Sequence, residues 1–147
     1  QQAAAIVHGD YRLDNTMLDA DGSVIAVLDW EICTLGDPLA DVGLLLCYWP
    51  DPGDAAAMPQ VSTVGLPGFP RRADLLAAYG RVSNLDLSNI NYYMAFGYWK
   101  LGCIIAGVSA RYAGGSMGEA GREEAEGFRT MIEGIEALAY SALEQTT

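Results

Sequence analysis

The stretch "VHGDYRLDN", residues 7–15, contains the single histidine of this 147-residue chain together with two aspartates, an arginine and an asparagine. A short apolar segment at residues 4–8 leads into it and is predicted to be a strand. The stretch is also the start of a strongly acidic region. The first 41 residues contain eight carboxylates and one basic residue, Arg12. So many acids in a short region repel one another unless a cation binds among them.

The residues that follow predict a β-hairpin. Residues 15–18 can extend, "DADG" at 19–22 is a turn signal, and "SVIAVLDW" at 23–30 is rich in β-branched and apolar side chains. A hairpin that folds between these segments places the start of one strand beside the end of the other. We therefore expect Asn15 and Asp29 to lie close together.

The remainder of the chain predicts helices, and the fold class is α+β, mostly helical, in one domain without repeats. The helices are expected at 36–49, 71–83, 89–112 and 119–145. Asp37 is the expected N-cap of the first of them. A proline-rich segment at 50–70 separates the first two helices, and irregular segments of this length are often functional.

Composition excludes several functions. The hydrophobic content of 51% indicates a folded protein, and a net charge of −11 disfavours nucleic acid and anionic membranes as partners. The three cysteines form no CxxC pair, which argues against zinc and favours a reducing, cytoplasmic location. The apolar stretch 92–112 carries Lys100 at its middle and has helical periodicity, so we interpret it as a core helix rather than a membrane span. Its aromatic residues at 92, 93, 98 and 99 are expected in the core, with the wall of an acceptor pocket as the alternative.

Oxygen ligands across the hairpin suit Mg²⁺. Asn15 offers an amide oxygen and Asp29 a carboxylate, and Mg²⁺ is commonly held by one or two such groups together with substrate phosphates. Asp10 lies on the preceding loop and could accept a proton from a substrate hydroxyl. These are the parts that phosphoryl transfer needs. The alternative is that each of these residues merely stabilises a turn.

Three motifs carry a family resemblance. Protein kinases use a catalytic loop H-R-D-x-x-x-x-N with a later metal-binding aspartate, and His8, Asp10 and Asn15 keep that spacing with glycine in place of the arginine. Together with "VLDWE" at 27–31 and "GDPLADV" at 36–42, the chain resembles the aminoglycoside phosphotransferase-like kinase family, especially the branch associated with acyl-CoA dehydrogenases. The resemblance implies the C-terminal lobe of a protein-kinase-like fold, in which a short β-hairpin carries the catalytic loop and about four helices follow.

The same resemblance implies roles for the residues of the loop and hairpin. Asp10 is similar to the catalytic base of the family, and Asn15 and Asp29 to its Mg²⁺ ligands, with ATP as the phosphate donor. Arg12 corresponds to a basic residue near the γ-phosphate. Its alternative is a salt bridge to Asp14 or Glu31.

Three further residues are implied as structural support. His8 is similar to the histidine that braces the loop backbone. Asp41 is similar to the helix aspartate that holds the loop by hydrogen bonds, and Glu31 adds a carboxylate behind the metal ligands.

Family members also carry an N-terminal nucleotide lobe, with a glycine-rich loop and a phosphate-binding lysine. This chain has neither before His8, and its single lysine is Lys100. The sequence also lacks an initial methionine, so we expect the gene product to continue upstream. We expect residues 1–147 to be the C-terminal lobe alone, to bind ATP weakly and to have little kinase activity by themselves.

The acceptor is predicted only as a small molecule with a hydroxyl group. The resemblance to the acyl-CoA dehydrogenase-associated branch favours a hydroxyacyl-CoA, whereas the acidity favours a cationic aminoglycoside-like acceptor. The competing hypothesis is a non-catalytic binding module that pairs with another chain, or forms a homo-oligomer, through the apolar surface that the N-lobe would cover.

Overall fold

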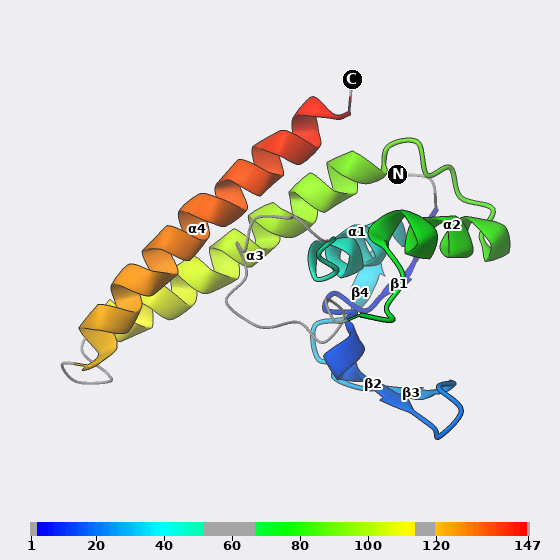
Figure 1. Cartoon of the computed structure of the whole chain (residues 1–147), viewed down its shortest axis with the longest axis horizontal. Helices are drawn as coiled ribbons and strands as arrows, with labels where there is room; N and C mark the ends of the chain where they lie inside the picture. The colour runs from blue at the N-terminus through cyan, green and yellow to red at the C-terminus, as the bar shows by residue number, and fades with distance from the viewer. Residues whose placement is uncertain (1–2, 52–66, 114–119, 147) are drawn as a thin grey trace.

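The computed structural model describes residues 3–51, 67–113 and 120–146. Most of the proline-rich segment at 50–70 lies outside the described residues. The chain is mixed α+β, as the sequence predicts, with small antiparallel sheets at one side of a set of helices (Figure 1).

Two separate two-stranded sheets form the β part. β2 (Thr16–Leu18) pairs with β3 (Val24–Val27), so the predicted hairpin is confirmed. A short 3-10 helix, η1 (Leu13–Asn15), leads into it. β1 (Ala5–Val7) is the predicted first strand, and it pairs with β4 (Thr34–Gly36), which the sequence did not indicate.

The second hairpin strand is shorter than predicted. It was expected over 23–30 but ends at Val27, because Asp29 takes a left-handed backbone conformation with φ 64° that a strand cannot continue through. This break turns the chain away from β2 and back toward β1.

The other regular elements of the described chain are helices, at the predicted places. They are α1 (Leu39–Cys47), α2 (Arg72–Val82), α3 (Ile90–Ala113) and α4 (Ala120–Glu144). α1 starts three residues later than expected, because the preceding residues belong to β4 and a turn. The N-cap residue is therefore Pro38 and not Asp37 as expected, although the Asp37 carboxylate accepts the Leu39 N–H at 3.1 Å.

The core lies where α1 and α4 pack on α3 (Figure 1). Leu46 of α1 and Ile135 of α4 are almost fully buried, and Met94 and Leu101 of α3 lie between the two helices. The α1–α3 contact is close because Gly43 has no side chain. A Cβ placed there would lie 2.5 Å from the backbone of Tyr93.

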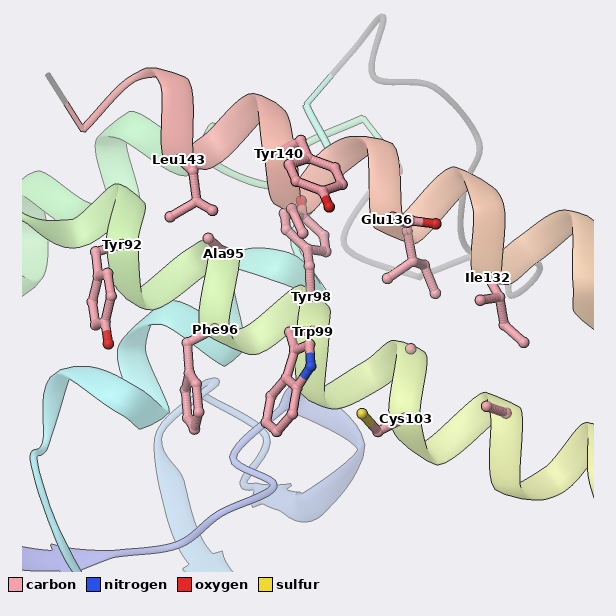
Figure 2. A pocket seen from close by; sticks show the side chains of 14 residues that line it. Tyr92, Ala95, Phe96, Tyr98, Trp99, Cys103, Ile132, Glu136, Tyr140 and Leu143 are labelled. Atoms are coloured by element: carbon pink, nitrogen blue, oxygen red, sulfur yellow. The ribbon is translucent and has the colours of Figure 1, made fainter.

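The prediction that all four aromatic residues at 92–99 are core is wrong for two of them. Tyr98 is buried and Tyr93 is half-buried, but Tyr92 and Trp99 are exposed. They line a largely apolar groove of about 580 Å³ between α3 and α4, which we call the α3–α4 groove. Figure 2 shows its side chains, which include Phe96 and Trp99 from α3 and Tyr140 and Leu143 from α4. In the part of the chain that the structure describes, every helix is too short or too polar to cross a bilayer.

Candidate active site

The loop after β1 depends on Gly9. Its φ of 87° is a left-handed conformation that favours glycine. A Cβ at this position would also lie 3.0 Å from the carbonyl oxygen of Ile32 and almost as close to its side chain. The loop therefore runs directly against the turn that follows Asp29, and the arginine of the kinase pattern could not replace Gly9 here without moving that turn.

Helices α1 and α3 hold the loop backbone. The Asp41 carboxylate of α1 accepts the His8 N–H at 2.6 Å and the Gly9 N–H at 2.8 Å. At the same residue, the Lys100 ammonium of α3 donates to the Gly9 carbonyl oxygen. Charged groups make stronger hydrogen bonds than neutral ones, so both contacts fix the loop firmly.

His8 connects the loop to the hairpin. The ring is buried, its Nδ1 accepts the Asp10 N–H at 3.2 Å, and its Nε2 lies 2.7 Å from the Leu28 carbonyl oxygen. An amide N–H can only donate and a carbonyl can only accept, so the ring is neutral with its proton on Nε2. A histidine fixed in this way braces the backbone, and its ring packs on Trp30 with a centroid separation of 4.7 Å.

Asn15 is buried and meets both Asp10 and the second hairpin strand. Its Nδ2 donates to the Asp10 carbonyl at 2.7 Å and to Asp10 Oδ2 at 3.0 Å. The backbone carbonyl oxygen of Asn15 accepts the Leu28 N–H at 2.8 Å. Because the side-chain nitrogen Nδ2 of Asn15 faces Asp10, the side-chain oxygen Oδ1 lies on the other side of the amide group. Leu28 is the residue before Asp29, so its hydrogen bond ties the chain next to Asp29 to Asn15.

Asp29 is exposed and, among the described non-glycine residues, the one with a positive φ. Such strained conformations cluster at functional sites, where the surrounding structure maintains them. An amide oxygen and an exposed carboxylate form a hard, oxygen-only donor pair, which fits Mg²⁺. The described residues contain no group of three or more His, Cys, Asp or Glu placed to hold a metal. A cation at Asn15 and Asp29 would therefore need further oxygen ligands from a substrate or water.

Arg12 lies next to the Asp10 carboxylate. Its Nη1 is 3.4 Å from Asp14 Oδ2, and its Nε is 3.5 Å from Asp10 Oδ2. Of the two salt bridges that the sequence allowed, the one to Asp14 is present, and Glu31 is not among the ion-pair partners of Arg12 in the described residues. The Nε atom is buried and has no hydrogen-bond acceptor in the part of the chain that the structure describes. A buried donor left in this state is unusual and is compatible with a ligand oxygen at this position.

Two residues that contribute to the site lie outside the sequence motifs. Lys100 is one, and Tyr48, directly after α1, is the other. The Tyr48 ring lies under the Arg12 guanidinium, 5.1 Å from Cζ to the ring centroid. Burial, and then the negative charge of Asp10, raises the pKa of Tyr48 to about 12.

The structure thus joins Asp10 and Asn15 by hydrogen bonds, pairs Arg12 with Asp10 as an ion pair, and ties Leu28, the residue before Asp29, to Asn15. His8 and Asp41 support the loop from behind. Glu31 is different, because it is exposed in the turn that follows Asp29, and its role remains a prediction.

Comparison with known proteins identifies the class. A family described as "Phosphotransferase enzyme family" matches residues 1–75, which include the whole loop, the hairpin and α1. The chain belongs to this phosphotransferase family, so the resemblance drawn from the motifs is confirmed.

The most informative relatives are two vertebrate proteins and one bacterial structure. "Acyl-CoA dehydrogenase family member 11" of Gallus gallus is 32% identical over 97% of this chain and 20% of its own length. The Homo sapiens protein of the same name is 36% identical over 73% of this chain and 14% of its own length. A crystal structure assigned as an aminoglycoside phosphotransferase from Ralstonia eutropha JMP134 superposes with a TM-score of 0.69 and 30% identity, over 94% of this chain and 43% of that one. The chain therefore spans about a fifth or less of these two curated relatives.

Proposed function

We propose that this chain is the catalytic-loop lobe of a small-molecule kinase that transfers the γ-phosphate of ATP to a substrate hydroxyl. The observation that carries the proposal is the single hydrogen-bonded network joining Asp10, Asn15 and the Leu28–Asp29 segment. A turn-forming role explains each polar residue separately. It does not explain why a strained, exposed aspartate follows a residue that is bonded to a buried asparagine, which also orients a second carboxylate.

Asp10 is the proposed general base. Its carboxylate is about one-quarter exposed, at 27%, so a substrate hydroxyl can reach it. Asn15 donates to Oδ2, which directs the carboxylate and leaves its other oxygen to accept the proton of the attacking hydroxyl. In phosphoryl transfer such positioning, rather than covalent chemistry, supplies most of the rate.

Asn15 and Asp29 are the proposed magnesium ligands. Mg²⁺ held there would supply positive charge to the phosphate oxygens of ATP. Arg12 is proposed to add a second cation next to the transferred phosphate, to which its Nε, which has no hydrogen-bond acceptor among the described residues, can donate.

The adenine and the remaining phosphates of ATP need another lobe. The single lysine, Lys100, donates to the Gly9 carbonyl oxygen, so we do not propose it as the phosphate-binding lysine of a nucleotide site. This chain matches only 20% and 14% of the lengths of the two curated relatives. We propose that a nucleotide lobe outside these 147 residues completes the enzyme in the cytoplasm, and that the chain alone has little kinase activity.

The α3–α4 groove is the proposed site for the acceptor. Trp99 borders it, and Lys100, the next residue of α3, contacts the catalytic loop. Glu136 is the one charged side chain among the described residues that line the groove. An apolar wall of this kind favours a hydroxyacyl group, as in a hydroxyacyl-CoA, over a polycationic aminoglycoside.

A panel of acceptors tests this function. The intact protein that carries the chain is incubated with ATP and Mg²⁺ and with hydroxyacyl-CoA thioesters, aminoglycosides, choline or sugars. We expect Mg²⁺-dependent phosphorylation of a hydroxyacyl compound, detected by mass spectrometry. Phosphorylation of an aminoglycoside instead would reject the acceptor assignment but keep the kinase. Absence of phosphorylation across the panel would favour the binding module.

The binding module is the second candidate because apolar side chains are exposed on the β part. Ile6 and Leu35 face each other across β1 and β4 and are 70% and 76% exposed. Such a pair is suited to covering by another lobe or chain.

A further inference from the structure

Lys100 is the single lysine of the chain, and it contacts the loop that carries Asp10. It lies near the middle of α3, half-buried, and its ammonium donates to the Gly9 carbonyl oxygen. A cation that is partly removed from water usually has an acidic partner. None of the ion pairs within the described residues includes Lys100. Its contact is instead with the backbone of the catalytic loop.

The Gly9 carbonyl belongs to the peptide unit that joins Gly9 to Asp10. The N–H of the same unit is that of Asp10, which donates to His8 Nδ1 at 3.2 Å. Lys100 and His8 thus hold the two polar groups of one peptide unit. Glycine tolerates many backbone conformations, so without these contacts the unit could rotate at low cost. Rotation would change the φ angle of Asp10 and, with it, the direction of the Asp10 side chain.

Asp41 supports a different part of the loop. Its carboxylate accepts the N–H groups of His8 and Gly9, which belong to the two preceding peptide units. Both backbone angles of Gly9 lie between those units and the one that Lys100 holds. The two supports are therefore not equivalent. Asp41 fixes the start of the loop, whereas Lys100 acts on the unit that leads into Asp10.

The residue before Lys100 has a different role in the proposed site. Trp99 borders the α3–α4 groove, and Lys100 is not among the described residues that line it. Consecutive residues of an α-helix point about 100° apart around the helix axis, so adjacent side chains contact different parts of a molecule. A substitution at Lys100 should therefore affect the catalytic loop while the residues that line the acceptor groove stay the same.

We propose that Lys100 is a positioning residue for phosphoryl transfer, whose ammonium holds the Gly9–Asp10 peptide unit in the orientation that directs the Asp10 carboxylate toward the acceptor hydroxyl. This inference rests on the proposed function, in which Asp10 is the general base. It assigns a role to a residue outside the three motifs of the sequence, 91 positions from Gly9.

The first test is spectroscopic and observes this peptide unit in the 147-residue chain. Glycine labelled with ¹³C at the carbonyl and aspartate labelled with ¹⁵N select the Gly–Asp peptide bonds, which occur at 9–10, 36–37 and 53–54. The signals of the first two bonds are identified by their loss in Asp10→Asn and in Asp37→Asn.

We expect Lys100→Met to move the Gly9 carbonyl signal upfield, because a charge-assisted hydrogen bond to that oxygen is lost. Lys100→Arg keeps a cationic donor and should retain more of the wild-type shift. The Gly36 carbonyl signal is the internal control, since Gly36 lies in β4 and should not move.

The second test is kinetic and uses the intact protein with ATP, Mg²⁺ and its acceptor. Lys100→Met keeps the apolar stem and removes the ammonium, and we expect kcat to fall about 30-fold with the acceptor KM within about twofold. Lys100→Arg should restore kcat to within about fivefold of the wild type. Arg81→Met removes an exposed cation from α2 and is the control, with both constants within about twofold of the wild type.

Thermal unfolding of each variant separates a misdirected base from a lost fold. We expect the Lys100→Met variant to remain folded, because the substitution removes no core side chain. Lys100→Gln is a second neutral variant with the same expected loss of kcat, should the methionine variant not fold.

The outcomes separate this inference from the proposed function. A Gly9 carbonyl shift that is equal in Lys100→Met and in the wild type overturns the positioning role, whether or not the protein is a kinase. A Lys100→Met kcat equal to that of the wild type also overturns it, as does a loss of activity that lies entirely in the acceptor KM. A wild-type protein that phosphorylates no acceptor overturns the proposed function, and with it the part of Lys100 in catalysis.

Discussion

Gly9 has both of its backbone polar groups held by charged side chains. Asp41 accepts its N–H and Lys100 donates to its carbonyl oxygen, while its own left-handed backbone brings it against Ile32. The position of the neighbouring Asp10 is consequently determined by three elements, which are the loop, α1 and α3. A general base needs this precision, because a misplacement of about 1 Å can lower a rate about 100-fold.

The Asp41 contacts predict a measurable loss of stability. Asp41→Asn removes the charge and places an amide donor against the N–H groups of His8 and Gly9. We expect the free energy of unfolding of the chain to fall by about 2 to 3 kcal/mol, measured by denaturant titration. Asp21→Asn is the control, since Asp21 lies exposed in the β2–β3 turn and should be nearly neutral. Equal stabilities of the two variants would show that Asp41 does not hold the loop.

At this scale, the sequence predicts local proximity better than distant contacts. Asp10 and Asn15 are five residues apart, and one hairpin brings Asp29 to them, so spacing was sufficient. Lys100 is 91 residues from Gly9, and its contact depends on how α3 docks. Tyr48 similarly depends on the orientation of α1, which no motif specifies.

Among the elements, the helices were predictable and one strand was not. The four helices have the apolar spacing and turn signals that define them. β4 has three residues, "TLG", and its partner β1 lies about 30 residues earlier. Its strand conformation comes from that pairing rather than from local propensity, so a single sequence gives no signal for it.

The packing of α1 on α3 can be tested at Gly43. Gly43→Ala forces a methyl group to within 2.5 Å of the Tyr93 backbone, which must move. We expect a loss of about 2 kcal/mol or more in the free energy of unfolding. The control is Gly127→Ala in α4, where no atom lies within 4 Å of the added Cβ. That variant should be neutral or more stable, because alanine is the better helix former. A neutral Gly43→Ala would contradict the close helix contact.

For the molecule as a whole, the distribution of exposed apolar side chains is uneven. Many belong to the β part and the turns next to it, as do Ile6, Met17, Ile25, Trp30 and Leu35. By comparison, many apolar side chains of α1, α3 and α4 are buried in the core that these helices form. This β surface is the proposed contact for the nucleotide lobe, and without a partner it should favour association.

Association of the isolated chain therefore depends on this surface. We expect the wild-type chain to self-associate in sedimentation velocity experiments and Leu35→Glu to shift it toward monomer. Val82→Glu is the matched control, because Val82 is 86% exposed and is the last residue of α2 rather than part of the sheets. A monomeric wild type, or an equal effect of both variants, would argue that the β surface needs no partner.

The account as a whole rests on Asp10 as the base of a Mg²⁺-dependent phosphotransferase. The most direct measurement is the rate of phosphate transfer from ATP by the intact protein, compared between Asp10→Asn and the exposed control Asp21→Asn. We predict a loss of at least about 100-fold for Asp10→Asn, with unchanged thermal stability, and a wild-type rate for the control. Transfer at the wild-type rate by Asp10→Asn would contradict the account.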